Sequence, residues 1–143
     1  MIAYNMKRRM RTRASIIVFS ACCSIAASRS VWDGVYTKQQ AMRGQTAYRE
    51  ECLKCHAENL AGGEAAPALV GDEFLQKWNG KTAGALYELM RKTMPSDDPG
   101  GLSTRQYADM LAYIFSANQF PAGEKELDRE LPSLNEIRIE TRK

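Results

Sequence analysis

The sequence is poor in histidine and cysteine, two of the side chains that most often bind transition metals. Its 143 residues contain four cysteines and a single histidine, His56. No acidic residue precedes Asp33, no internal repeat is visible, and no strand-like alternation of polar and apolar residues persists. The lone histidine excludes any site that needs two imidazoles, and the missing alternation argues against a β-rich fold.

The first 28 residues have the composition of an export signal. Five basic residues lie within positions 1–13, and the 14 residues Ala14–Ala27 carry no charge. Small residues follow, and a secretory signal peptide cleaved near Ser28 is predicted. The apolar stretch is shorter than the roughly 20 residues of a bilayer span. An uncleaved amphipathic anchor and lipid attachment at Cys22 are the alternatives.

Removal of this segment changes the sign of the net charge. The whole chain has 20 Lys and Arg against 17 Asp and Glu, which gives +3. Residues 1–28 hold five of the basic residues and no acid, so 15 basic residues face 17 acids and the charge becomes −2. The basic cluster therefore does not indicate a nucleic-acid partner. Residues 29–143 are predicted to form one domain, and a hydrophobic content of 44% is enough for a packed core.

Residues 52–56 read Cys-Leu-Lys-Cys-His, which is the attachment sequence of c-type haem. Two thiols separated by two residues reach the two vinyl groups on one porphyrin edge. The following histidine is then held beneath the iron. Cys52 and Cys55 are therefore predicted to bind one haem c covalently, with His56 as an iron ligand. Attachment outside the cytoplasm agrees with the export signal.

Three other interpretations of this motif compete with haem attachment. A structural zinc site needs about four ligands, so Cys52, Cys55 and His56 would require a carboxylate as well. A thioredoxin-type redox pair requires a βαβ context, whereas the flanking sequence predicts helices. A plain disulfide would be strained at this short spacing.

The candidates for the second axial ligand of the iron are methionines, because the chain has no second histidine. Met94 is favoured, since Pro95 disfavours helical backbone before it and the Pro, Asp and Gly residues that follow predict a loop. Met90 and Met110 are predicted to fill the core, and Met42 is poorly placed. A His/Met pair raises the haem potential. A filled sixth site favours electron transfer over the alternative of an enzyme or gas sensor with an open site.

Capping residues and apolar periodicity predict four to five short helices. Thr37 and Ser103 each precede a Gln by three residues, which is the form of a capping box. Asp72 and Thr82 are the predicted caps of two further helices. The expected helices cover about 38–51, 72–78, 82–92 and 103–117. Residues 57–71 are expected to form a loop over the haem, and 118–143 a surface tail with a short helix near 133–140.

Together these features resemble the class I c-type cytochromes, small monohaem electron carriers of the bacterial type that accompanies quinoprotein dehydrogenases. The resemblance covers about residues 37–117 and implies an all-α cytochrome c fold around the haem. The lead-in from Val31 to Tyr36 carries the likeness to the cytochromes of quinoprotein dehydrogenases. The matching residues are Gly44, Tyr48, Cys52, Cys55, His56, Pro67, Leu69, Trp78, Met94, Pro95 and Tyr113.

The resemblance also implies roles for residues around the haem. The carbonyl of Pro67 accepts a hydrogen bond from His56, and Leu69 packs on the haem. Trp78 donates its indole N–H to a haem propionate, with plain core packing as the alternative role. A close crossing of the first and last helices is expected at three residues, Gly44, Tyr48 and Tyr113.

The implied function is electron transfer in the periplasm rather than catalysis. The donor is expected to be a quinoprotein dehydrogenase or a quinol-oxidising membrane complex, with the protein soluble or peripherally associated with the membrane. The alternative is a tightly bound cytochrome subunit of a larger oxidoreductase. Lys54, Lys77 and Lys81 are expected to form a basic patch for an acidic redox partner.

Overall fold

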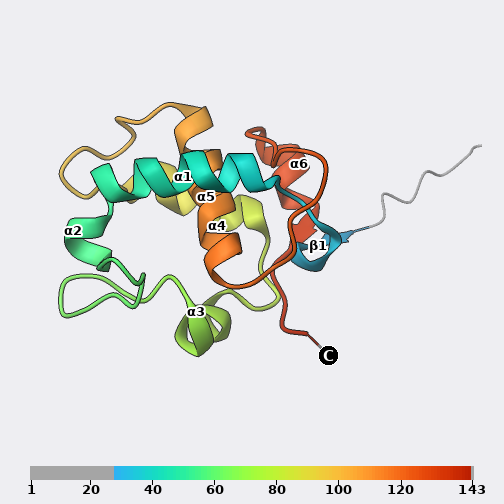
Figure 1. Cartoon of the computed structure of the whole chain (residues 1–143), viewed down its shortest axis with the longest axis horizontal. Helices are drawn as coiled ribbons and strands as arrows, with labels where there is room; N and C mark the ends of the chain where they lie inside the picture. The colour runs from blue at the N-terminus through green and yellow to red at the C-terminus, as the bar shows by residue number, and fades with distance from the viewer. Residues whose placement is uncertain (1–27, 143) are drawn as a thin grey trace, which may run out of the picture.

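The computed structural model describes residues 28–142, and helices form most of this part (Figure 1). Apart from Ser28, the predicted signal peptide lies outside the described residues, as does the alternative lipid site at Cys22. The helices are α1 (Lys38–Glu51), α2 (Leu53–His56), α3 (Gly71–Trp78), α4 (Ala83–Thr93), α5 (Thr104–Ala117) and α6 (Leu131–Asn135). A 3-10 turn (Val31–Asp33) and two short strands, β1 (Arg29–Ser30) and β2 (Ile137–Arg138), complete the elements. The all-α prediction is confirmed. None of the described helices has the length and apolar character needed to cross a membrane.

Helices α1 and α5 cross at the centre of the fold, and they form its most extensive helix pair (Figure 1). A Cβ atom added at Gly44 would lie 1.8 Å from the carbonyl oxygen of Asp109 and 2.9 Å from Cβ of Tyr113. The Tyr48 and Tyr113 rings pack with centroids 5.3 Å apart. Glycine therefore permits the close backbone approach, and the expected crossing is confirmed.

Three predicted helix starts are confirmed by side-chain caps. The hydroxyls of Thr37, Thr82 and Ser103 each accept a hydrogen bond from the backbone N–H three residues later. Helix α5 has a complete capping box, since the side chain of Gln106 accepts from the Ser103 backbone N–H at 3.0 Å. These caps satisfy backbone donors that have no partner inside the helix.

Two details of the predicted helix starts are wrong. Gln40 does not complete a capping box with Thr37, because its buried amide binds both the N–H and the C=O of Leu127, at 2.6 and 3.0 Å. Asp72 does not cap α3, which begins at Gly71 after Val70 and has no side-chain cap. Asp72 lies in the first turn instead, where a carboxylate interacts favourably with the helix dipole.

The prediction of a surface tail after Asn118 is wrong. The tail contributes five buried side chains to the same hydrophobic core as the helices, and α6 lies within it. Regular structure in the tail is limited to α6 and β2, and Phe120 and Leu127 are buried outside both, so helical or strand periodicity does not indicate their burial. The buried tail residues are Phe120, Leu127, Leu134, Ile137 and Ile139.

The lead-in and the tail pack side by side at the end of the molecule away from α2 (Figure 1). Strands β1 and β2 pair in parallel, with Arg29 opposite Ile137. The Tyr36 hydroxyl donates to the carbonyl of Phe120 at 2.6 Å, and the Phe120 ring packs against Trp32 with centroids 4.9 Å apart. The two segments therefore close the core at this end.

Candidate cofactor pocket

An apolar pocket opens at the other end of the core, between α2 and the helices α3, α4 and α5. Its lining is mostly apolar, with a few polar groups at the mouth, which is the composition typical of small-molecule sites. All seven residues predicted to contact the haem line this one pocket. They are Cys52, Cys55, His56, Pro67, Leu69, Trp78 and Met94.

His56 ends α2 and is held in a fixed orientation. Its side chain is buried, and Nδ1 lies 2.9 Å from the carbonyl oxygen of Pro67, the contact that the resemblance implies. A neutral imidazole that donates from Nδ1 presents the lone pair of Nε2 to a metal. The pocket loop thus prepares His56 to be an axial ligand.

The loop that carries Pro67 folds back on the end of α2. The Gly62 N–H donates to the carbonyl of His56 at 3.0 Å, and the Leu69 N–H donates to the carbonyl of Leu60 at 2.8 Å. Gly62 has φ of +69°, and a Cβ there would lie 2.5 Å from the carbonyl oxygen of Ala66. This glycine allows the tight turn that brings Pro67 to the imidazole.

The two cysteines face the pocket as free thiols. Burial, the nearby Glu51 and Cys55 raise the pKa of the Cys52 thiol to about 11. Cys52 is therefore a poor candidate for the reactive thiolate of a redox pair. Within residues 28–142, no three His, Cys, Asp or Glu side chains lie close enough to hold a metal ion, which argues against the zinc interpretation.

Met94 follows α4 in an extended conformation, with φ −126° and ψ 148°, as Pro95 predicts. Its backbone N–H donates to the carbonyl of Met90, and its carbonyl accepts from the Tyr107 hydroxyl at 2.6 Å. The anchoring role of Tyr107 was not predicted from the sequence. No pattern in the sequence indicates where a buried hydroxyl will bond.

The other three methionines of residues 28–142 occupy contrasting environments. Met90 and Met110 are buried and also line the pocket, and Sδ of Met110 lies 3.6 Å from Sγ of Cys52. Met42 is 68% exposed on α1 and does not reach the pocket. Sequence reasoning thus identified the core positions of Met90 and Met110 but missed that they border the same space as Met94.

Trp78 ends α3 and forms part of the pocket wall. Its side chain is buried, the Phe74 ring lies beside it, and the ammonium of Lys81 lies 5.1 Å from the indole centroid. This geometry provides a packing role for Trp78. Its predicted hydrogen bond to a haem propionate stays a prediction.

The three lysines of the expected basic patch lie in different environments. Lys54 forms an ion pair with Asp97, which follows Met94 in the next loop, and this pairing raises the pKa of Lys54. Lys77 lines the pocket, and Lys81 lies over Trp78. The unexpected ion pair joins the attachment motif to the Met94 loop at the pocket mouth.

Comparison with known families gives one match. A family model described as cytochrome C oxidase, cbb3-type, subunit III matches residues 39–114, more than half of the chain. The matched range runs from α1 into α5 and contains all seven predicted pocket residues. Comparisons with curated proteins and with solved structures give no match.

Proposed function

Because this chain belongs to the family described as cytochrome c oxidase, cbb3-type, subunit III, we propose that it is a periplasmic electron carrier with one haem c. The cytochrome c domain of the family implies a covalently bound haem with iron and supports haem-based electron transfer. The observation that carries the proposal is the convergence of the predicted ligands and thiols on one apolar pocket. The pocket belongs to an electron-transfer protein rather than to a typical enzyme.

The residues present fit a c-type haem. Cys52 and Cys55 would hold it as thioethers, His56 would bind the iron through Nε2, and Met94 would bind it through sulfur. When bound, the haem supplies a one-electron redox centre. Pro67 fixes the imidazole, and Tyr107 fixes the backbone of Met94. Ligands held in this way change position little between oxidation states, which favours rapid electron transfer.

The proposed electron donor is a quinoprotein dehydrogenase or a quinol-oxidising membrane complex. Support comes from the lead-in from Val31 to Tyr36, which resembles that of cytochromes accompanying quinoprotein dehydrogenases. The carrier would meet its partner transiently through a small interface. Reduction of the purified cytochrome by a purified quinoprotein dehydrogenase, measured by stopped-flow absorbance, tests this donor class. Rates no higher than those with an unrelated dehydrogenase would contradict it.

The second candidate function is a tightly bound subunit of a larger oxidoreductase. It is favoured by the family description, which names a subunit of an oxidase. Purification from native membranes in low and high salt distinguishes the two functions, because salt weakens an electrostatically steered, transient partner. A complex that survives high salt supports the subunit, and release of the free cytochrome supports the carrier.

The axial ligand is tested by two matched substitutions. Met94→Leu removes the proposed ligand, whereas Met90→Leu changes a pocket methionine that we do not assign to the iron. Both keep similar volume, so the fold should tolerate them. We expect M94L to change the visible spectrum and to lower the reduction potential by on the order of 100 mV, while M90L keeps both. The assignment of Met94 as the axial ligand would be refuted if M94L kept the spectrum and potential of the wild type, or if M90L changed them more than M94L does.

A further inference from the structure

Residues 79–82 connect Trp78 to α4 without regular structure of their own. Asn79 is the C-cap of α3, Gly80 has φ of +80°, and Thr82 caps α4. Within this turn, the Lys81 N–H donates to the carbonyl of Trp78 at 2.9 Å. The position of Trp78 in the pocket wall therefore depends on what holds this exposed turn.

The C-terminal segment 137–141 binds this turn through four hydrogen bonds. Two run between backbones, one joins a side chain to a backbone carbonyl, and one joins a backbone N–H to a side-chain oxygen. They are Gly80 N–H to Ile139 O at 2.7 Å, Ile139 N–H to Lys81 O at 2.9 Å, Arg138 Nη1 to Gly80 O at 2.7 Å and Thr141 N–H to Asn79 Oδ1 at 3.1 Å. Almost every residue of the turn is thus tied to the C-terminus.

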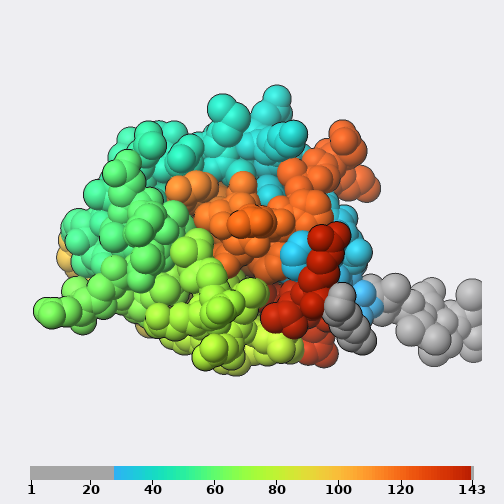
Figure 2. Space-filling view, turned by 60° about the horizontal axis from the view of Figure 1, so that its bottom comes forward, coloured from blue at the N-terminus to red at the C-terminus, as the bar shows by residue number. Residues whose placement is uncertain are grey.

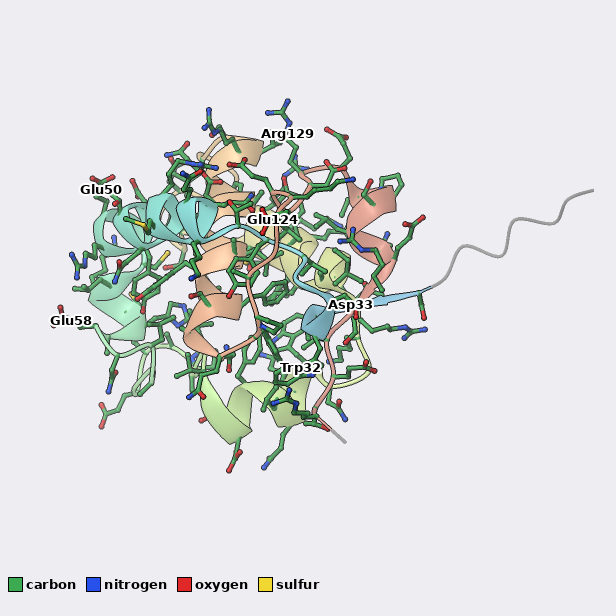
Figure 3. The ribbon with its side chains drawn as sticks, turned by 45° about the vertical axis from the view of Figure 1, so that its right-hand side comes forward. Trp32, Asp33, Glu50, Glu58, Glu124 and Arg129 are labelled. Atoms are coloured by element: carbon green, nitrogen blue, oxygen red, sulfur yellow. The ribbon has the colours of Figure 1, made fainter. Side chains whose placement is uncertain are left out.

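The same segment is anchored on its other side. Ile137 and Ile139 are fully buried, and β2 pairs with β1 of the lead-in. The indole N–H of Trp32 donates to the carbonyl of Glu140 at 2.9 Å. Figure 2 shows the red C-terminal residues lying between the blue lead-in and the green-yellow α3 region, and Figure 3 shows Trp32 beside the last residues of the chain. The segment is therefore a bridge between the lead-in and the pocket wall.

From these contacts we infer that residues 137–141 form a strap that positions Trp78 in the cofactor pocket and so sets the reduction potential of the site. The claim that the strap positions Trp78 is argued from the hydrogen bonds alone. The claim that it affects the reduction potential also depends on the proposed function. Without the strap, the turn loses these four hydrogen bonds, and we expect the indole at its start to shift within the pocket wall. The polarity and hydrogen bonding around a haem influence its potential, so a shifted indole changes it.

The test uses the full-length holoprotein labelled with 5-fluorotryptophan, in the reduced state. Trp32→Phe assigns the two fluorine resonances. Arg138→Met removes one bond to the turn and one exposed charge, and Arg29→Met is its matched control. Arg29 lies on β1. The substitution R29M removes an equal charge but no side-chain hydrogen bond to the turn. Deletion of residues 137–143 is the stronger variant.

We expect R138M to move the Trp78 fluorine resonance, to shift the reduction potential and to speed amide exchange in the Gly80–Thr82 turn about tenfold. R29M should leave all three as in the wild type. The deletion should enlarge each change. The proposal that the strap positions Trp78 would be refuted if R138M and R29M had equal effects. It would also be refuted if the Trp78 resonance did not move in the folded deletion variant. A moved resonance with an unchanged potential would overturn its effect on the site.

These readouts separate the strap from the proposed function. The fluorine resonance and the amide exchange can be measured whether or not the protein carries a haem. A purified native protein without haem would refute the proposed function, whereas the placement of Trp78 by the strap would still be decided by R138M and R29M.

Discussion

The two tryptophans lie at two ends of the core that are built in different ways. At the strap end, Trp32 is held by contacts within the chain: the carbonyl of Glu140, the ring of Phe120 and the guanidinium of Arg142. At the pocket end, Trp78 lines an apolar pocket that opens to solvent and that we propose binds a haem. The first end is thus held by the chain itself, and the second is proposed to be held by a bound group as well. The two ends should therefore respond differently when the cofactor or a core side chain is removed.

The largest effect is expected from removing both attachment thiols. In Cys52→Ala/Cys55→Ala the haem is no longer covalently held, and we expect a loss of about 4 kcal/mol or more of unfolding free energy, as for any tightly bound ligand. Amide exchange should show the larger loss of protection in α2 and α3, and the smaller loss at β1, β2 and α6. Equal loss at the two ends would contradict the difference between them.

A substitution at the α1–α5 crossing should affect both ends together. In Gly44→Ala the new Cβ would overlap the backbone carbonyl of Asp109, which cannot move without shifting α5. We expect a destabilisation of about 3 kcal/mol in chemical denaturation. Gly63→Ala is the control, because no atom lies within 4 Å of a Cβ at that position. Similar stability of the two variants would refute the close crossing.

A core truncation in the tail should damage the strap end alone. Leu134 is fully buried in α6, and Leu134→Ala should cost about 2–5 kcal/mol. The visible spectrum should not change, because Leu134 does not line the pocket. Met42→Ala, at an exposed position, should cost less than about 0.5 kcal/mol. If L134A were as mild as M42A, the tail would not belong to the core.

The smallest effect concerns the ion pair at the pocket mouth. Lys54 holds the pKa of Asp97 below its ordinary value of 3.8. The folded protein thus favours the carboxylate, so this stabilisation is present above pH 3.8 and is lost as the pH falls through the lower folded pKa. Lys54→Ala should raise the pKa of Asp97, measured by NMR titration, with almost no change in global stability because the pair is exposed.

The control for the ion pair is Lys92→Ala. It removes the partner of Glu88, in a second exposed pair on α4, and it should leave the titration of Asp97 unchanged. An Asp97 pKa that does not respond to K54A would show that the two loops are not joined at the pocket mouth.

The pocket end could be predicted from the sequence because the interactions that define it join residues close in the sequence. Thr82 and Ser103 cap helices through bonds to residues three positions away, and the attachment motif spans five consecutive residues. Pro95 constrains only its neighbour, which placed Met94 after a helix. Each of these interactions is decided within a few residues, whatever the rest of the chain does.

The strap end could not be predicted from the sequence because its interactions join residues that are distant in the sequence. Gln40 has the spacing of a capping box, yet the backbone of Leu127 takes its amide instead. Ile139 is buried in the tail, and its backbone pairs with Gly80 and Lys81, which are distant in the sequence. The Tyr107 hydroxyl and the Lys54–Asp97 pair were missed at the pocket for the same reason.

The central claim is that the pocket end is completed by one haem bound covalently at Cys52 and Cys55. The most direct test is the intact mass of the natively exported protein after acid-organic extraction, which removes haem that is not covalently bound. The predicted result is the mass of the processed polypeptide plus one haem. The mass of the polypeptide alone would contradict the claim.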